Sequence, residues 1–273
     1  PDADRVGTAA PDANGEYELI SGNEMGMLLL DYICRMRAAR GEDLRDKVVV
    51  TTIVSAPMAD ALVDDYGFEL RRTLTGFKFI GEQIGLLEAR GEAERFIFGF
   101  EESYGYLSGS YVRDKDAIDA GMLILQMTRH YKTRGKSVLD VLEELYGRYG
   151  YYRNSQISVT YPGAEGAARM QDITAGLRAC PPADIAGRRV EGLVDYLSET
   201  KMPVTGGRGD ADVQMLPQSD VLEFRLEGSA KMIVRPSGTE PKMKAYLFVQ
   251  GVDAREANAA LAGLEAAAEE MLA

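Results

Sequence analysis

The sequence predicts an α/β protein, with one layered α/β domain followed by an α+β domain that has a mainly antiparallel sheet and flanking helices. In the first half, short β-branched runs alternate with amphipathic helical runs, which is typical of layered α/β domains. In the second half, several short strand-like runs follow one another between helical runs, and this pattern favours an antiparallel sheet. A chain of 273 residues with 45% hydrophobic residues can bury two cores of this kind.

The first predicted domain covers residues 21–150. It opens with a helix at 23–40, where apolar residues recur at helical spacing until Gly41 ends the run. The following segments alternate between strand and helix: strand 48–55, helix 58–66, strand 69–74, helix 77–89, strand 96–100, and helices 116–131 and 139–149.

The second predicted domain covers residues 151–273. Its segments are a strand at 155–160, a helix at 163–177, and strands at 190–196, 221–226, 231–234 and 245–249. A glycine-rich polar loop is predicted at 205–212. Residues 253–256 form a capping-box pattern that opens a final alanine-rich helix.

Composition excludes several classes of function. A net charge of −12 argues against a nucleic-acid partner, although a few local cations could still bind a small anionic substrate. No apolar run approaches the length of a membrane span, no secretory signal opens the chain, and sparse cysteine fits a cytoplasmic location. Cys34 is expected to be a buried free thiol, and His130, the single histidine, a surface or packing residue.

A strand, a tight loop and a strand are predicted around residues 232–249. Arg235 can bind phosphate through its planar fork of donors, and Ser237 and Thr239 add hydroxyl groups. Backbone N–H groups around Gly238 can form a cavity for an anion, and Lys242 adds a second cation. Considered alone, the segment could also be an ordinary β-turn.

A second candidate site follows the strand at 96–100. Glu101 and Ser103 come directly after the strand, where open α/β sheets bind their ligands. Because they are two residues apart, their side chains can point the same way and hydrogen-bond sugar hydroxyls. A solvated acidic turn is the alternative interpretation.

The first residues of the chain give a third candidate. Asp2 and Asp4 could bind a hard cation such as Mg²⁺ from an extended loop, and Arg5 follows them. Two aspartates are few for a metal site. The alternative interpretation is that this terminal segment is disordered and binds no metal.

In this order the three motifs resemble the α-D-phosphohexomutase superfamily, which comprises phosphoglucomutases and phosphomannomutases. Residues 2–5 resemble the end of the family's Asp-x-Asp-x-Asp-Arg metal loop, of which the first aspartate is missing here. Residues 100–104 are similar to its Gly-Glu-x-Ser-Gly sugar loop, although Phe100 and Tyr104 replace both glycines. The phosphate loop matches at four positions: Arg235, Ser237, Gly238 and Thr239.

The resemblance also implies roles for residues outside these motifs. Gly76 and Phe77 lie in a segment similar to the family's Thr-Gly loop, which lines the sugar site. Lys115 lies in a basic segment after the sugar loop and is implied to be a catalytic cation. The form of these loops is closer to the glucose and pentose branches than to the mannose branch.

The family's nucleophile, a phosphorylated serine followed by histidine, has no counterpart here, because no Ser-His pair occurs in the sequence. The resemblance therefore implies a C-terminal fragment of a mutase that interconverts sugar 1-phosphates and 6-phosphates, or the pentose equivalents, through a sugar bisphosphate. It implies Mg²⁺ as cofactor, a phosphosugar substrate, the missing N-terminal domains as partners, and no turnover by the isolated chain. Residues 1–20 would be the end of a preceding domain, and a hinge is expected at 149–154. A standalone phosphosugar-binding or regulatory module is the alternative.

Overall fold

The computed structural model describes residues 2–198, 216–238 and 240–273. These residues form two compact units, with the boundary between Tyr149 and Gly150. The predicted fold class is confirmed, since a layered α/β unit precedes a unit built on an antiparallel sheet. The predicted loop at 205–212 lies outside the described residues.

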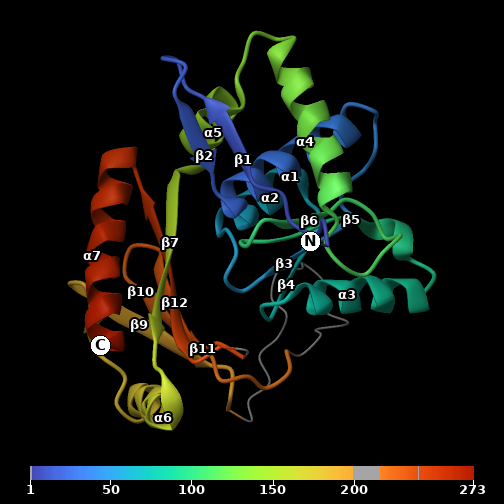
Figure 1. Ribbon diagram of the computed structural model, residues 1–273. Coiled ribbons are helices and arrows are strands. Elements are labelled where there is room, and N and C mark those ends of the chain that lie inside the picture. Colours follow the sequence, from blue (N-terminus) through green and yellow to red (C-terminus); the bar gives the residue numbers. More distant parts are fainter. Residues whose placement is uncertain (1, 199–215, 239) are drawn as a thin grey trace. The chain divides into compact units, whose positions relative to one another are not determined.

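Unit 1, residues 2–149, contains a two-stranded hairpin and a four-stranded sheet with helices (Figure 1). Its elements are β1 (Thr8–Pro11), β2 (Tyr17–Ile20), α1 (Gly22–Ala38), β3 (Val48–Thr52), α2 (Met58–Tyr66), β4 (Glu69–Thr73), α3 (Phe77–Ala89), the 3-10 helix η1 (Ala93–Arg95), β5 (Phe96–Glu101), β6 (Gly105–Leu107), α4 (Ala117–Lys132) and α5 (Val138–Tyr149).

The strand order of the larger sheet in unit 1 is β4-β3-β5-β6. Strand β3 is parallel to β4 and to β5, whereas β6 is antiparallel to β5. All five residues of β3 are buried, as expected for a central parallel strand covered on both faces. The carboxyl ends of three neighbouring strands therefore meet at one edge of the sheet.

Local chemistry explains where the helices begin and end. Ser21 and Glu24 form a capping box at the start of α1, and the Asp116 side chain accepts two backbone N–H groups at the start of α4. Helix α2 ends at Gly67, whose φ of 79° lies in the left-handed region. Helices α2 and α3 have the bounds that the sequence predicts.

Unit 2 consists of residues 150–198 and 216–273 and contains one six-stranded antiparallel sheet with strand order β7-β12-β11-β10-β9-β8. One face of this sheet packs on two helices to form the hydrophobic core. The elements are β7 (Tyr151–Thr160), α6 (Gly163–Ala179), β8 (Asp184–Ile185), β9 (Arg188–Asp195), β10 (Leu222–Leu226), β11 (Ala230–Pro236), β12 (Lys242–Gly251) and α7 (Ala254–Leu272).

The unit boundary falls inside the segment 149–154 where a hinge is expected, and the hinge itself stays a prediction. Residues 151–154, which were expected to belong to a hinge, form the first part of β7 and pair with residues 248–251 of β12. Gly150, with φ of 104°, is the residue between α5 and β7. The sequence pattern missed the early start of β7 because it identified only the alternating part of this strand, residues 155–160.

Two other expectations are confirmed. Cys34 is buried and free, and burial raises the pKa of its thiol to about 12. His130 is a packing residue whose ring lies edge-on to Tyr32 and Tyr131, with centroids 5.5 and 5.1 Å away.

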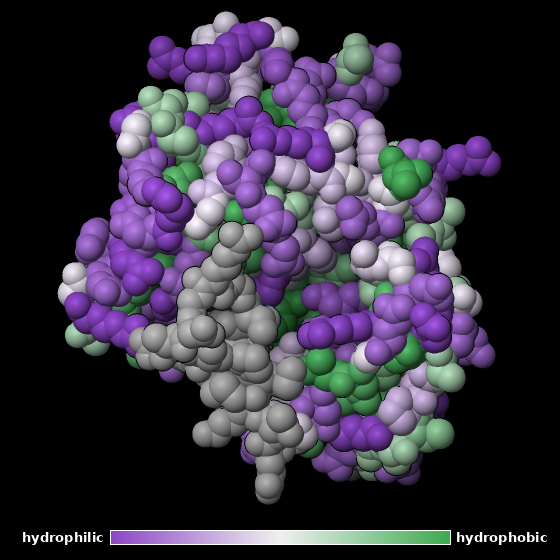
Figure 2. All heavy atoms as spheres, turned by 180° about the vertical axis from the view of Figure 1, so that it is seen from behind, coloured by the Kyte–Doolittle hydropathy of each residue, from purple (hydrophilic) through white to green (hydrophobic). Residues whose placement is uncertain are grey.

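The surface is hydrophilic over most of the face seen in Figure 2, in keeping with 27% charged residues. Within the described part of the chain, none of the helices is both long and apolar enough to cross a bilayer.

Candidate functional site

The first candidate site lies at the edge of the unit 1 sheet where β3, β4 and β5 end. Open α/β sheets bind ligands at this edge, because the loops that follow neighbouring parallel strands converge there. Arg72 on β4 fixes the loop after β3, because its guanidinium donates to the carbonyls of Thr52, Ser55 and Ala56 at 3.3–3.4 Å. This loop is therefore a fixed wall beside the end of β5.

Glu101 is the last residue of β5 and is only 4% exposed. The Ser103 hydroxyl donates to its Oε1 at 3.0 Å, so the two predicted sugar-binding residues are in direct contact. Burial raises the pKa of the Glu101 carboxyl, although the bond from Ser103 and the charge of Lys115 oppose this shift. A buried carboxylate with one oxygen already bonded can accept a further hydroxyl donor without losing its geometry.

The loop from Glu101 to Gly105 is held tightly by its neighbours. Tyr104 has a φ of 65°, a left-handed conformation that is uncommon outside glycine. A Cβ on Gly22, at the start of α1, would lie 2.0 Å from the Glu102 carbonyl oxygen, so only glycine permits this approach. The Thr51 hydroxyl also donates to the Phe100 carbonyl at 2.9 Å. The loop from Glu101 to Gly105 is thus fixed by contacts within unit 1.

Lys115 lies beside this loop although it comes later in the sequence. Its Nζ is 3.1 Å from Asp4 Oδ2 and 3.0 Å from Asp114 Oδ1, and its side chain is only 11% exposed. Burial alone would lower the Lys115 pKa, but its hydrogen bonds to Asp114 and Asp4 outweigh burial and raise it. The site therefore contains a permanent cation next to Glu101.

The N-terminal segment reaches the same place. The Ala117 N–H donates to the Ala3 carbonyl at 3.1 Å, and the Val6 N–H donates to the Tyr104 carbonyl at 3.2 Å. The bond from Lys115 lowers the pKa of Asp4, and the neighbouring Asp2 acts in the same direction. The structure thus brings the predicted metal loop and the sugar loop together within unit 1.

These residues fit a magnesium ion only in part. No group of three or more histidine, cysteine or acidic side chains within the described ranges could hold a metal. Asp2 and Asp4 offer carboxylate oxygens of the kind that Mg²⁺ prefers, but one oxygen of Asp4 already pairs with Lys115. The two aspartates therefore do not complete a metal site by themselves.

Gly76 and Phe77 lie at the start of α3. Gly76 has a φ of 123°, which a residue with a side chain would rarely adopt. Phe77 is 4% exposed and belongs to a core cluster, and the Lys115 Nζ lies 5.7 Å from the centre of its ring. The Phe77 ring therefore makes a cation–π contact with Lys115 and joins this lysine to the hydrophobic core.

The second candidate site is the turn between β11 and β12 in unit 2. The Ser237 N–H donates to the Lys242 carbonyl at 2.7 Å, which closes the turn, and the Lys242 ammonium pairs with Glu240 at 3.0 Å. Arg235 is half-buried, and its guanidinium makes no ion pair or side-chain hydrogen bond with another described residue. Gly238 is exposed at the tip of the turn, and Thr239 lies outside the described residues.

The sequence patterns missed one further cation at this turn. Lys244 is paired directly opposite Arg235 across β11 and β12, so the two side chains project from the same face of the sheet. Like charges at opposed positions repel each other, and an anion held between them would remove that cost. The sequence alone does not give this pairing, because only the register of β11 against β12 places Lys244 opposite Arg235.

Comparisons with known proteins agree on one family. Residues 21–149 match the model of "Phosphoglucomutase/phosphomannomutase, alpha/beta/alpha domain III". The chain is 36% identical over 254 residues to a phosphoglucomutase of Staphylococcus aureus strain MRSA252, covering 93% of this chain and 44% of that protein. It is 35% identical over 263 residues to a probable phosphomannomutase of Haemophilus influenzae, covering 96% of this chain and 47% of that protein. The chain thus spans less than half the length of these relatives.

Solved structures share the fold at low sequence identity. The open form of parafusin, a phosphoglucomutase from Paramecium, superposes with a TM-score of 0.67 at 18% identity, covering 99% of this chain and 43% of that one. An N-acetylphosphoglucosamine mutase of Aspergillus fumigatus in complex with GlcNAc-6P and magnesium gives a TM-score of 0.52 at 13% identity, covering 99% and 48%.

Proposed function

The chain belongs to the α-D-phosphohexomutase superfamily and corresponds to its C-terminal part, and we propose that it carries the loops that hold the sugar and the distal phosphate in a phosphomutase. The enzyme would interconvert sugar 1-phosphates and 6-phosphates, or the pentose equivalents, through a sugar bisphosphate. The observation that carries this proposal is the contact of the buried Glu101 with Ser103 and the Lys115 cation beside it.

Each loop has its own task in this proposal. Glu101 and Ser103 bind sugar hydroxyls, and their rigid loop suits a substrate that must bind in two orientations. Lys115 acts as the catalytic cation near the reacting phosphate. Gly76 and Phe77 line the site next to Lys115. A second set holds the phosphate that is not reacting: Arg235, Ser237, Gly238, Thr239 and Lys242.

The proposal also includes a bound magnesium ion. Asp2 and Asp4 would contribute two of its oxygens and Arg5 would flank them, while no third histidine, cysteine or acidic side chain among the described residues completes the site. The ion, when bound, stabilises the negative charge of a transferring phosphoryl group.

The domain division is part of the same proposal. Residues 1–20 would end a preceding domain, 21–150 would recognise the sugar, and 151–273 would bind phosphate. The β1–β2 hairpin supports the first assignment, because its outer face exposes Tyr17 (74%) and Leu19 (86%) and an isolated two-stranded sheet is marginal in water.

Two measurements on the isolated chain test the function. Glucose 1-phosphate with glucose 1,6-bisphosphate should give no turnover, because the sequence holds no Ser-His pair. Glucose 1-phosphate should nevertheless bind, and Glu101→Gln should weaken binding by about tenfold or more, because a charged acceptor is lost. Glu102→Gln is the matched control from the same loop, and we expect its effect to be clearly smaller.

Robust turnover by the chain would contradict the proposal. An equal loss of binding in the two variants would argue against the role of Glu101. Coding sequence upstream of residue 1 that lacks a Ser-His loop would favour a standalone phosphosugar-binding or regulatory module.

A further inference from the structure

The Asp4 carboxylate has two candidate cationic partners, and the structure shows one of them in contact with it. Asp4 Oδ2 lies 3.1 Å from the Lys115 ammonium. The proposed function assigns the same carboxylate, together with Asp2, to a divalent cation. A carboxylate that is paired with an ammonium attracts a second cation less strongly, because its negative charge is already balanced. The contact between Lys115 and Asp4 therefore affects metal binding as well as the position of the lysine.

Lys115 is held in place on several sides. Its Nζ also lies 3.0 Å from Asp114 Oδ1 and 5.7 Å from the centre of the Phe77 ring, and its side chain is only 11% exposed. A Cβ on Gly105 would lie 2.7 Å from Lys115 Cδ, so the glycine leaves room for the lysine stem. The ammonium cannot turn into solvent without losing these contacts.

The backbone around Asp4 is fixed as well. The Ala117 N–H donates to the Ala3 carbonyl at 3.1 Å, and the Val6 N–H donates to the Tyr104 carbonyl at 3.2 Å, so both sides of Asp4 are bonded to other parts of unit 1. The Asp4 side chain is 28% exposed, and an ion from solution can still reach it. A divalent cation on Asp4 would thus lie near a fixed ammonium, and the two positive charges would repel each other.

We propose that Lys115 competes with a divalent cation for the Asp4 carboxylate, so that the lysine weakens metal binding as long as no anion is bound. The inference rests on the proposed function in taking Asp2 and Asp4 as the cation-binding residues. It adds a condition to that function. A phosphate group that accepts hydrogen bonds from the ammonium offsets the repulsion, so phosphate binding and metal binding favour each other.

Titration with Mn²⁺ tests the competition, because oxygen ligands that suit Mg²⁺ also suit Mn²⁺ and the bound ion shortens water-proton relaxation without any turnover. The titrations use a chloride buffer without phosphate. Lys115→Met removes the charge but keeps an unbranched stem, and we expect it to bind Mn²⁺ at least about tenfold more tightly than wild type. Lys115→Gln should show the same gain with a polar side chain. Lys115→Arg keeps the charge and should bind Mn²⁺ as weakly as wild type.

Lys132→Met is the matched control for net charge, because Lys132 is exposed in the last turn of α4 and its loss changes the charge of the chain equally. It should change the Mn²⁺ affinity by less than about twofold. Second substitutions in the Lys115→Met chain locate the bound ion. Asp4→Asn or Asp2→Asn should remove the gain. Asp114→Asn should leave it, because Asp114 pairs with the lysine and is not one of the proposed metal ligands.

Three results would overturn the proposal. The first is equal Mn²⁺ binding by wild type and Lys115→Met, including the case in which neither binds. The second is an equal gain in Lys132→Met, which would assign the effect to net charge. The third is a gain that needs Asp114 but not Asp2, which would place the ion where the ammonium had been. Binding of glucose 1-phosphate without Mn²⁺ tests the proposed function separately, so failure of one is distinguishable from failure of the other.

Discussion

Glu101 lies in the candidate site, but burying its negative charge destabilises the folded state. Burial raises the pKa of its carboxyl above the ordinary value of 4.5, so the folded state favours the protonated form. For such a group, the contribution to stability is fully present below pH 4.5 and is lost as the pH rises through the raised value. Glu101→Gln keeps an oxygen for the Ser103 hydroxyl but removes the charge. We expect the variant to gain stability relative to wild type at pH 8 and to lose this advantage near pH 4.

Urea unfolding of both proteins at several pH values measures this difference. Glu18→Gln serves as the control, because Glu18 is exposed on β2 and its removal should give no comparable pH-dependent gain. An advantage of Glu101→Gln that is constant across pH, or that is larger at low pH, would contradict the assignment of a buried charge.

The sequence reveals individual site residues only where a motif is contiguous. Glu101 and Ser103 could be paired in advance, because they are two residues apart at the end of a strand. The contact of Lys115 with Asp4 could not, because it depends on a fold that places the N-terminal loop on the start of α4. Lys244 was missed for a related reason, since only the strand register places it opposite Arg235.

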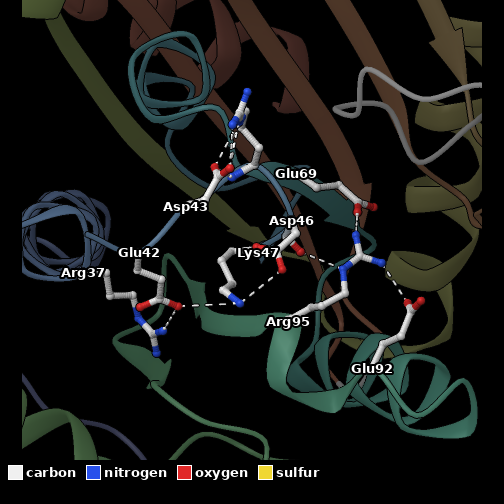
Figure 3. A network of polar contacts seen from close by, with 9 residues as sticks. Arg37, Glu42, Asp43, Asp46, Lys47, Glu69, Glu92 and Arg95 are labelled. Carbon is white, nitrogen blue, oxygen red and sulfur yellow. Dashed lines mark hydrogen bonds and ion pairs between the residues drawn. The ribbon is translucent and has the colours of Figure 1, made fainter. Parts of the chain in front are cut away.

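The amino ends of the strands in unit 1 are held by a network of charged side chains (Figure 3). Arg95, which ends η1, donates to the Asp46 carbonyl at 2.7 Å and pairs with Glu69 and Glu92 at 2.9 and 2.8 Å. It thereby links the segments that lead into three adjacent strands. We expect Arg95→Ala to lower the free energy of unfolding of unit 1 by about 1–2 kcal/mol, since its side chain is only 25% exposed.

Arg45 provides the matched control within the same network. It pairs with Asp43 at 2.6 Å, but the two side chains are 80% and 59% exposed, so water replaces the contact readily. Arg45→Ala should leave the urea midpoint unchanged. Equal effects of the two variants would mean that the links made by Arg95 do not stabilise the sheet, and high salt should reduce the Arg95 effect only in part.

Helices were easier to predict than the short strands. The bounds of α2 and α3 follow from apolar spacing and from flanking glycines, which are local signals. The sequence pattern did not identify β1, β2, β6 and β8, which have four residues or fewer. A strand this short has no periodicity of its own and is defined by its partner, as β6 is by β5.

The chain as a whole contains two units that each have a separate core. In unit 1, one cluster of buried residues joins α3 to β3 and β5, and Ile84 lies within it, fully buried. In unit 2, the cluster joins the six-stranded sheet to α6 and α7, and Leu264 is fully buried there. Neither cluster includes a described residue of the other unit. This arrangement predicts that a cavity made in one core acts on the stability of that unit alone.

Leu264→Ala and Ile84→Ala form a reciprocal pair that tests this prediction. Each removes a fully buried aliphatic side chain and should lower the free energy of unfolding of its own unit by about 3 kcal/mol. Native-state hydrogen exchange reads the two units separately, through the amides of β3 in unit 1 and of β11 in unit 2. Leu264→Ala should accelerate exchange in β11 and leave β3 at its wild-type rate, and Ile84→Ala should do the reverse. Acceleration of both strands by either variant would show that the two units unfold as one cooperative structure, because a cavity in one core then affects the other unit's strand through global unfolding.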